Sequence, residues 1–244
     1  MSKFNTNSNG YTLGFLAVMV IIVGGALAFI SSSLEDRIND NQELDRRKKI
    51  MKAILSLSED QENEVLTKEF VNAEYQGKVT GVLINYAGEV VEETIPVKYD
   101  FRKEMKDNNK AKEDKLYPVY IYDDNEGKVF VYQMIGNGLW DEINGFLALE
   151  ANQQTIKGVA FDHVGETPGL GAEMVKNKFR EQFYGQSLFD VNGNYDFVVY
   201  KSGKLPSGGK GVDGLAGATI TTDGINDMIR KTKDNYINYI SSAN

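Results

Sequence analysis

The feature that most constrains this chain is an uncharged apolar run near its start, from Leu13 to Ile30. Coiled as a helix, a run of this length spans roughly 27 Å, about the hydrocarbon thickness of a bilayer. A core helix of a soluble protein would show a polar face, and this run shows none. We therefore expect residues 1–33 to form a short tail and a transmembrane anchor, followed by one domain over residues 34–244.

A cleaved signal peptide is the main alternative, because Ala26-Leu27-Ala28 would provide a small-residue cleavage site. Against it, Lys3 is the sole basic side chain before the run, and the run is long for the apolar core of a signal peptide. A buried soluble helix is the least favoured interpretation.

Membrane orientation is left open by the charges. Arg37 and the cluster Arg46-Arg47-Lys48-Lys49 follow the run, and counted alone they would keep the C-terminal side in the cytoplasm. However, the positive-inside rule weakens when a large domain follows, and Glu35 and Asp36 lie closer to the run.

Composition excludes several kinds of chemistry. The chain has no cysteine and one histidine, so disulfides, thiolate nucleophiles, cysteine zinc sites, iron–sulfur clusters and multi-histidine metal centres are excluded. Its 35 acidic residues outnumber 27 basic ones, which argues against nucleic acid as a partner. With no side chain suited to difficult chemistry, we predict no catalytic residue and no metal site, and expect a bound cofactor or a binding role.

The pattern after the anchor predicts one α+β domain with a mixed or antiparallel sheet. Segments rich in β-branched and aromatic residues are expected as strands: Val79–Ile84, Val90–Val97, Val119–Tyr122, Val129–Ile135, Ile156–His163 and Phe197–Tyr200. Helical spacing or composition predicts helices over 34–57, Ala172–Phe183 and from about Asp223, and a helix or ordered connection over 59–76. The charged stretch Arg102–Lys115 is expected as an exposed excursion between strands.

One candidate site is the small-residue loop Asp213-Gly214-Leu215-Ala216-Gly217-Ala218-Thr219, which leads into the last helix. Its small residues allow a bulky group to approach the backbone, and a helix N-terminus suits a phosphate. Thr219 places a hydroxyl in that setting. The plainer alternative is a turn in which Thr221 or Thr222 caps the helix.

A second candidate is the loop after the strand that ends at His163, which reads Glu166-Thr167-Pro168-Gly169-Leu170-Gly171. Pro168-Gly169 is a turn signal, and this loop could expose backbone donors to a ligand. It is not a dinucleotide fingerprint, because Met174 occupies the position of the third glycine. A tight connection between strand and helix is the alternative.

Three further features are weaker. Ser207-Gly208-Gly209-Lys210 is followed by Gly211 and not by Ser or Thr, so we expect a flexible loop and no phosphate-binding loop. Trp140 is the sole tryptophan, and between Gly138 and Gly145 it could stack on a flat ring. His163 is expected to be a strand-end residue with a hydrogen bond, in preference to a general base.

Together these motifs resemble the FMN-binding domain found in the C subunit of the Na+-translocating NADH:quinone reductase. The resemblance spans nearly the whole chain: the anchor, the segment Leu44–Met51, Gly136-Asn137-Gly138-Leu139-Trp140, the Glu166–Gly171 loop and the terminal Gly-Ala-Thr. The G subunit of the Rnf electron-transport complex shares the last two motifs and stays an alternative. A non-redox anchored ligand-binding module is the alternative from another class.

The resemblance implies that a flavin transferase attaches FMN through its phosphate to the hydroxyl of Thr219 as a phosphoester. Ala216 departs from the family pattern, which has Ser or Thr there, and so lacks a hydroxyl that could bond the phosphate or aid the transferase. The cofactor-binding residues carried over are Thr219, Asp213, Gly214, Gly217, Ala218, Leu139, Trp140, Glu166, Thr167, Gly169, Leu170 and Gly171.

By the same resemblance, the flavin passes electrons along a chain from NADH in a partner subunit to quinone, coupled to sodium export. The implied partners are the other membrane subunits of the complex, with the flavin transferase during maturation. The family places this domain on the outer face of the bacterial cytoplasmic membrane, against the simple count of basic residues. The lack of cysteine agrees with that location.

Overall fold

The structure is a computed structural model that describes residues 8–57, 59–96, 99–124 and 127–242. The chain forms two compact units, Met1–Asp45 and Arg46–Asn244. Helix α1 (Asn9–Leu55) begins in the first unit and ends in the second. The expected boundary after residue 33 marks the end of the membrane segment and not the boundary between these compact units. It stays a prediction.

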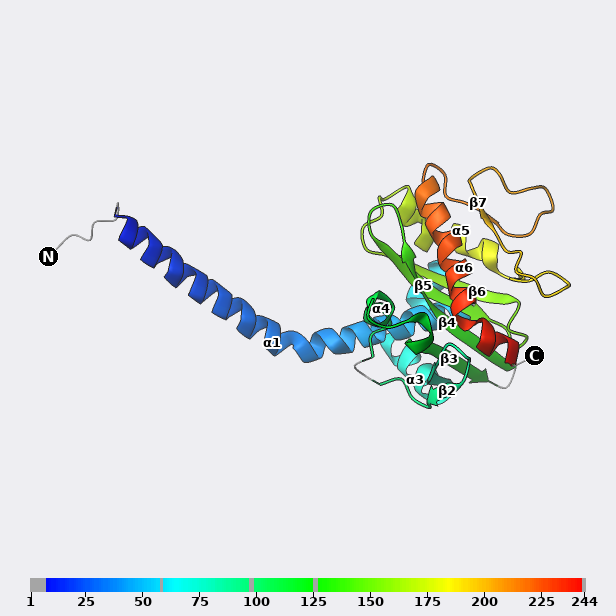
Figure 1. Ribbon diagram of the computed structural model, residues 1–244, viewed down its shortest axis with the longest axis horizontal. Coiled ribbons are helices and arrows are strands. Elements are labelled where there is room, and N and C mark those ends of the chain that lie inside the picture. Colours follow the sequence, from blue (N-terminus) through cyan, green and yellow to red (C-terminus); the bar gives the residue numbers. More distant parts are fainter. Residues whose placement is uncertain (1–7, 58, 97–98, 125–126, 243–244) are drawn as a thin grey trace. The chain divides into compact units, whose positions relative to one another are not determined.

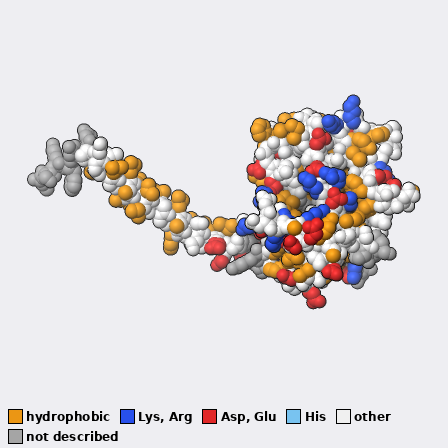
Figure 2. Space-filling view, viewed as in Figure 1, with side chains coloured by type: hydrophobic (Ala, Val, Ile, Leu, Met, Phe, Trp, Pro, Cys, Tyr) orange, Lys and Arg blue, Asp and Glu red, His pale blue; other side chains and the backbone are white. Residues whose placement is uncertain are grey.

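The first unit consists of the initial part of α1. All residues of the run Leu13–Ile30 are exposed, and Figure 2 shows hydrophobic side chains along this stretch of helix. Among the described residues, α1 is the one helix long and apolar enough to cross a bilayer. An N-terminal signal sequence would meet the same criteria, so the choice between anchor and signal peptide rests on the resemblance.

The second unit is built on a six-stranded antiparallel sheet in the order β2-β1-β3-β4-β5-β6 (Figure 1). Its strands are β1 (Val79–Ile84), β2 (Val90–Glu92), β3 (Tyr117–Asp124), β4 (Gly127–Asn137), β5 (Glu142–Leu149) and β6 (Ile156–His163). Two short strands, β7 (Val199–Tyr200) and β8 (Val212–Asp213), pair in parallel apart from it. The predicted α+β class is confirmed.

One face of the sheet is covered by the last helix, α6 (Thr219–Ser242), which crosses it in Figure 1. Gly136 on β4 makes close packing possible, because a Cβ there would lie 2.7 Å from the Cβ of Met228. Gly224 likewise lies against the backbone of Asn137. These glycines bring the first turns of α6 to the end of β4. The main core fills this face, with Tyr132, Met134, Ile143, Leu147, Ile225, Met228 and Ile229 among its buried members.

The other face is covered by the end of α1 and by α3 (Lys68–Lys78). Ile50, Met51, Ala53 and Ile54 of α1 are buried. Gly158 of β6 allows close contact, because a Cβ there would overlap the carbonyl of Ala53. A sheet covered on both faces has strands that are nearly apolar throughout.

The strand predictions differ from the structure at several elements. Strands β3 and β4 each extend two residues further at both ends than expected, β7 is shorter than expected, and β8 was not expected. Strand β5 is absent from the expected strands, because its glycine at 145 and its burial on both sides hide the alternation that marks a half-exposed strand. Strand β2 ends at Glu92, earlier than the expected Val97, which itself lies outside the described residues.

The helix predictions need three corrections. The connection 59–76 forms two helices, α2 (Glu59–Val65) and α3. The expected helix Ala172–Phe183 is interrupted, because Lys176 adopts an extended conformation; it comprises the 3-10 turn η2 (Gly171–Val175), α5 (Asn177–Arg180) and the 3-10 turn η3 (Glu181–Phe183). The last helix begins at Thr219 and not near Asp223.

The expected excursion Arg102–Lys115 contains α4 (Phe101–Lys106) and the 3-10 turn η1 (Lys112–Asp114). Most of its side chains are exposed, as expected. Two of its cations nevertheless hold a buried acid: Arg102 Nε lies 2.5 Å and Lys106 Nζ lies 2.8 Å from the carboxylate of Glu142. Glu142 begins β5, two residues after Trp140, so α4 is attached to the base of that loop.

Candidate functional site

The Gly-Ala-Thr segment forms a tight turn that ends in the first turn of α6. The N–H of Ala218 donates to the carbonyl of Leu215 (3.2 Å), and Gly217 takes a φ of +72° within this turn. Thr219, the first residue of the 24-residue helix, is exposed. The opening N–H groups of a helix have no helical partners, so the Thr219 hydroxyl lies where an anion is favoured.

Neither Thr221 nor Thr222 caps this helix, which corrects the plainer alternative. Both lie inside α6 and are buried. The hydroxyl of Thr222 accepts a hydrogen bond from the N–H of Leu215 (3.0 Å), which fixes the turn to the helix. The hydroxyl of Thr221 instead points to Glu166. The apolar pattern of α6 starts near Ile225, whereas the helix itself begins at Thr219. The pattern misses the first turn because the side chains buried there are the threonines Thr221 and Thr222.

Asp213, the last residue of β8, and Gly214 lead into the turn before Thr219. The Asp213 carboxylate accepts a hydrogen bond from the N–H of Gly203 (2.7 Å), and its backbone exchanges two hydrogen bonds with the side-chain amide of Gln182. A Cβ on Gly214 would overlap the carbonyl of Tyr200 and the side chain of Thr222. Both residues therefore shape the loop, and the Asp213 carboxylate is already engaged within the protein.

The second motif is a compact turn. The carbonyl of Thr167 accepts hydrogen bonds from the N–H groups of Leu170 (3.1 Å) and Ala172 (3.2 Å), and Gly169 takes a φ of +77°. The motif begins just after β6, where the N–H of Glu166 donates to Nδ1 of His163 (3.3 Å). The prediction that His163 is a hydrogen-bonded strand-end residue is confirmed.

Glu166 links the three motifs of the candidate site: the Gly136–Trp140 segment, the Glu166–Gly171 loop that it begins, and, through the first turn of α6, the Asp213–Thr219 loop. Its side chain is buried, with an exposed fraction of 5%. One carboxylate oxygen accepts hydrogen bonds from the N–H groups of Leu139 (2.7 Å) and Trp140 (3.2 Å). The other accepts a hydrogen bond from the hydroxyl of Thr221 (2.6 Å). The carboxylate thus ties the β4–β5 loop to the first turn of α6.

Two glycines make room for this carboxylate. A Cβ on Gly138 would overlap its Oε1, and a Cβ on Gly171 would overlap its Oε2. Gly138 also closes the β4–β5 loop by donating from its N–H to the carbonyl of Asp141 (2.8 Å). Glycine at these two positions is therefore explained by the close approach of the Glu166 side chain.

Large apolar side chains are exposed around this junction. Trp140 is 68% exposed, and its indole N–H donates to the hydroxyl of Thr167 (3.2 Å). Leu170 lies over Gly217, since a Cβ there would be 2.9 Å from its Cδ2. Leu139 and Ile220 are also exposed. Figure 2 shows hydrophobic side chains at the surface of this end of the domain, where α6 begins. Such an apolar surface beside an anion-binding helix end suits a flat ring that carries a phosphate.

The structure therefore brings the predicted residues of all three motifs to one end of the sheet. Three residues there were not predicted from the sequence: Gly138 as a site residue, Ile220 and Thr221. The last two immediately follow Thr219, and an earlier start for the helix would have placed them in its first turn. Thr221 carries no signal of its own for a contact with a carboxylate in another loop.

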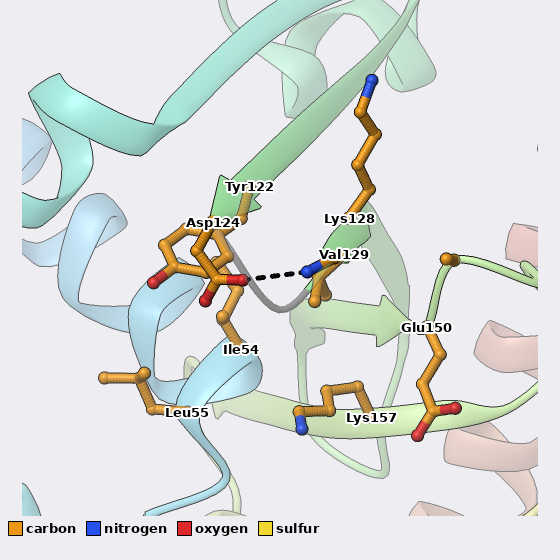
Figure 3. Close-up of a pocket in the computed structure, with 10 residues that line it drawn as sticks. Ile54, Leu55, Tyr122, Asp124, Lys128, Val129, Glu150 and Lys157 are labelled. Atoms are coloured by element: carbon orange, nitrogen blue, oxygen red, sulfur yellow. Dashed lines mark hydrogen bonds between the residues drawn. The ribbon is translucent and has the colours of Figure 1, made fainter.

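A cavity of about 360 Å³ lies elsewhere in the domain (Figure 3). It is at the beginning of β4, whereas the Leu139–Trp140 loop follows the end of that strand. In Figure 3 the side chain of Lys128 extends away from the other lining residues. The lining residues are Ile54, Leu55, Tyr122, Asp124, Gly127, Lys128, Val129, Glu150, Ala151 and Lys157, all outside the three motifs.

The lysine at the end of the loop 207–210 is fixed by contacts within the protein. The ammonium of Lys210 lies 3.2 Å from the carboxylate of Asp196 and donates to the carbonyl of Phe189 (2.9 Å). This lysine is thus paired within the protein.

Comparison with known proteins identifies the domain. The family model described as the FMN-binding domain matches residues 138–234, a range that includes Leu139, Trp140, the Glu166–Gly171 loop and the Asp213–Thr219 loop. The C subunit of the Na(+)-translocating NADH-quinone reductase of Vibrio parahaemolyticus is 30% identical over 236 residues, 91% of this chain and 89% of the relative. The corresponding protein of Haemophilus ducreyi is 27% identical over 94% of this chain and 91% of the relative.

Solved structures agree. The crystal structure of the C subunit of the Na(+)-translocating NADH-quinone reductase from Parabacteroides distasonis superposes with a TM-score of 0.73 at 29% identity, covering 86% of this chain and 98% of that one. Shewanella oneidensis NqrC shares the fold, with a TM-score of 0.67. Sequence, fold and motif order coincide over most of the chain. The chain therefore belongs to the family formed by the C subunits of the Na(+)-translocating NADH-quinone reductases.

Proposed function

We propose that this chain is the FMN-carrying subunit of a Na+-translocating NADH:quinone reductase, with FMN joined to Thr219 by a phosphoester. The observation that carries the proposal is the exposed Thr219 hydroxyl at the start of a 24-residue helix, beside the exposed Trp140 and Leu170. Bound FMN would supply reversible electron transfer, which no side chain of this composition provides.

The residues present fit FMN in three respects. The first turn of α6 offers N–H groups and a positive dipole end to a phosphate. Gly217, with a φ of +72°, forms the turn that leaves the Thr219 side chain at the surface. Leu139, Trp140 and Leu170 offer an apolar surface to a ring system, with the indole held by Thr167.

The attachment exchanges one P–O bond for another. Oγ1 of Thr219 bonds to the flavin phosphorus, and the anhydride P–O bond of a pyrophosphate-linked flavin dinucleotide on the flavin transferase breaks. A nucleoside monophosphate leaves, and the hydroxyl proton passes to it. The helix end offsets negative charge on the phosphate during this step. In the mature protein, Asp213 and Glu166 hold the loops through their own hydrogen bonds.

The attachment is tested by co-expressing the full chain with a flavin transferase and measuring its intact mass. We expect one added FMN, which Thr219→Val loses and Thr219→Ser keeps. An adduct of the same yield on Thr219→Val would refute the site. A colourless wild-type protein without an adduct would favour the non-redox binding module.

We also propose that α1 is a retained anchor and that the domain lies on the outer face of the cytoplasmic membrane. The support is the exposed apolar run of α1 together with family membership. Protease added to spheroplasts should digest the domain, and the purified protein should keep residues 1–33. Protection of the domain until lysis would reverse the orientation, and a shortened mature chain would favour the signal peptide.

A further inference from the structure

Glu166 has a geometry that its expected role as a flavin contact does not explain. The side chain is 5% exposed, and both carboxylate oxygens already accept hydrogen bonds from the protein. A carboxylate aimed at a ligand would keep at least one oxygen turned toward the surface. Here the exposed groups nearby are Leu139, Trp140 and Leu170, while the carboxylate lies beneath them.

The three groups that donate hydrogen bonds to Glu166 belong to two elements that are far apart in the sequence. Leu139 and Trp140 lie in the β4–β5 loop, which carries the exposed apolar surface. Thr221 lies two residues after Thr219, within the same first turn of α6. The Glu166 carboxylate is thus a direct bridge of hydrogen bonds between the apolar surface and the helix end that presents the Thr219 hydroxyl.

We propose that Glu166 is a positioning residue, which fixes the Leu139–Trp140 loop against the start of α6 before the flavin is attached, and which does not touch the flavin itself. This inference rests on the proposed function, because the arrangement it fixes is that of the proposed FMN site. A site that is already in its binding conformation loses less conformational entropy when the ring and the phosphate of the flavin bind.

Two conservative variants separate the possible roles. Glu166→Gln removes the charge but keeps Oε1 as an acceptor for both amides. Glu166→Asp keeps the charge but is one methylene shorter, so it cannot reach both the loop and Thr221. Glu166→Ala removes all contacts. Glu93→Ala is the matched control, because Glu93 is exposed on a segment outside the three motifs.

The first measurement needs no flavin. Amide hydrogen exchange of Leu139 and Trp140 is measured in the full, flavin-free chain in detergent, together with the indole signal of Trp140, the sole tryptophan. We expect exchange to quicken roughly tenfold or more in Glu166→Ala and to quicken in Glu166→Asp, because buried hydrogen bonds are lost. Glu166→Gln and Glu93→Ala should stay within about twofold of wild type.

The second measurement uses the flavinylated chain. Quenching of Trp140 fluorescence by FMN should weaken in Glu166→Asp and should stay closer to that of wild type in Glu166→Gln, which keeps Oε1 as the acceptor for the two loop amides. Unchanged amide exchange in both Glu166→Ala and Glu166→Asp would overturn the proposal. Quenching in Glu166→Asp equal to that of wild type would also overturn it, since the loop would then be placed correctly without the Glu166 bridge.

If Glu166→Ala does not fold, Glu166→Asp and Glu166→Gln still decide between the outcomes. If the wild-type chain takes up no flavin at all, the proposed function fails, while the exchange measurement still tests whether Glu166 positions the loop.

Discussion

The hydroxyl of Thr221 donates a 2.6 Å hydrogen bond to the carboxylate of Glu166, 55 residues earlier in the chain, and both side chains are buried. Two residues before Thr221, the side chain of Thr219 is exposed. One turn of helix therefore presents one threonine to the core and another to the surface, and the two should respond differently to the same substitution.

Thr221→Val should lower the free energy of unfolding by about 1–3 kcal/mol, because it leaves a buried carboxylate oxygen without its donor. Thr219→Val should change it by less than about 0.5 kcal/mol, since that side chain is exposed. Denaturant unfolding of the full chain measures both. Equal losses in the two variants would contradict the assignment of their hydroxyls.

Gly217→Ala should disturb the proposed site through Leu170. Gly217 has a φ of +72°, and a Cβ there would lie 2.9 Å from Cδ2 of Leu170. Backbone strain alone should cost about 1 kcal/mol. We expect weaker quenching of Trp140 fluorescence by attached FMN as well, because Leu170 must move.

The matched control is Gly193→Ala, which has a similar φ of +81° and nothing within 4 Å of the added Cβ. It should show the stability loss without the change in quenching. If both variants altered the quenching equally, contact with Leu170 would not be the cause.

Ala216→Thr should speed attachment of FMN. Ala216 is exposed in the turn before Thr219, so a hydroxyl there fits without displacing core residues. One added hydrogen bond to the phosphate would quicken the reaction about fivefold. Intact-mass time courses with limiting transferase give the rate. Ala216→Val, of the same shape but without the hydroxyl, should react no faster than wild type.

Stability should fall in alkali because of buried tyrosines. Burial raises the pKa of Tyr117 to about 12 and raises the pKa of Tyr132 and Tyr236 well above the ordinary 10.0. These phenols stay neutral in the folded chain, whereas the unfolded chain ionises them at about pH 10. Their contribution is fully present below that pH and is lost as the pH rises toward the folded pKa, at ~1.4 kcal/mol per pH unit for each group.

In a titration to high pH, tyrosinate absorbance reports ionisation and far-ultraviolet circular dichroism reports folding. The buried tyrosines should ionise only as the circular dichroism signal is lost. Tyr236→Phe removes one of them and should show a shallower fall of stability above about pH 10. The same variant loses the hydrogen bond from Tyr236 to the carbonyl of Pro118 (3.1 Å), so its stability near neutrality should be lower. An unchanged alkaline slope would contradict the assignment.

The sequence by itself determined the features that depend on local pattern. An uncharged apolar run predicts a membrane-length helix, as in α1, and β-branched segments predict strands such as β1 and β6, whose bounds agree with the structure. The motifs of the candidate site were also recognisable, because each is short and continuous. Strand β5 was missed, since burial on both faces removes the alternation on which such predictions depend.

Only the tertiary structure decided how the motifs meet. Glu166, Thr221 and the Leu139–Trp140 loop come together because antiparallel pairing of β4, β5 and β6 places their loops at one end, and Gly136 and Gly224 let α6 pack close to β4. Hydrogen bonds between residues so distant in the chain leave no periodic trace in the sequence. The inward turn of Glu166 and the true start of α6 at Thr219 follow from these long-range contacts, which stabilise a helix turn that propensity alone would not predict.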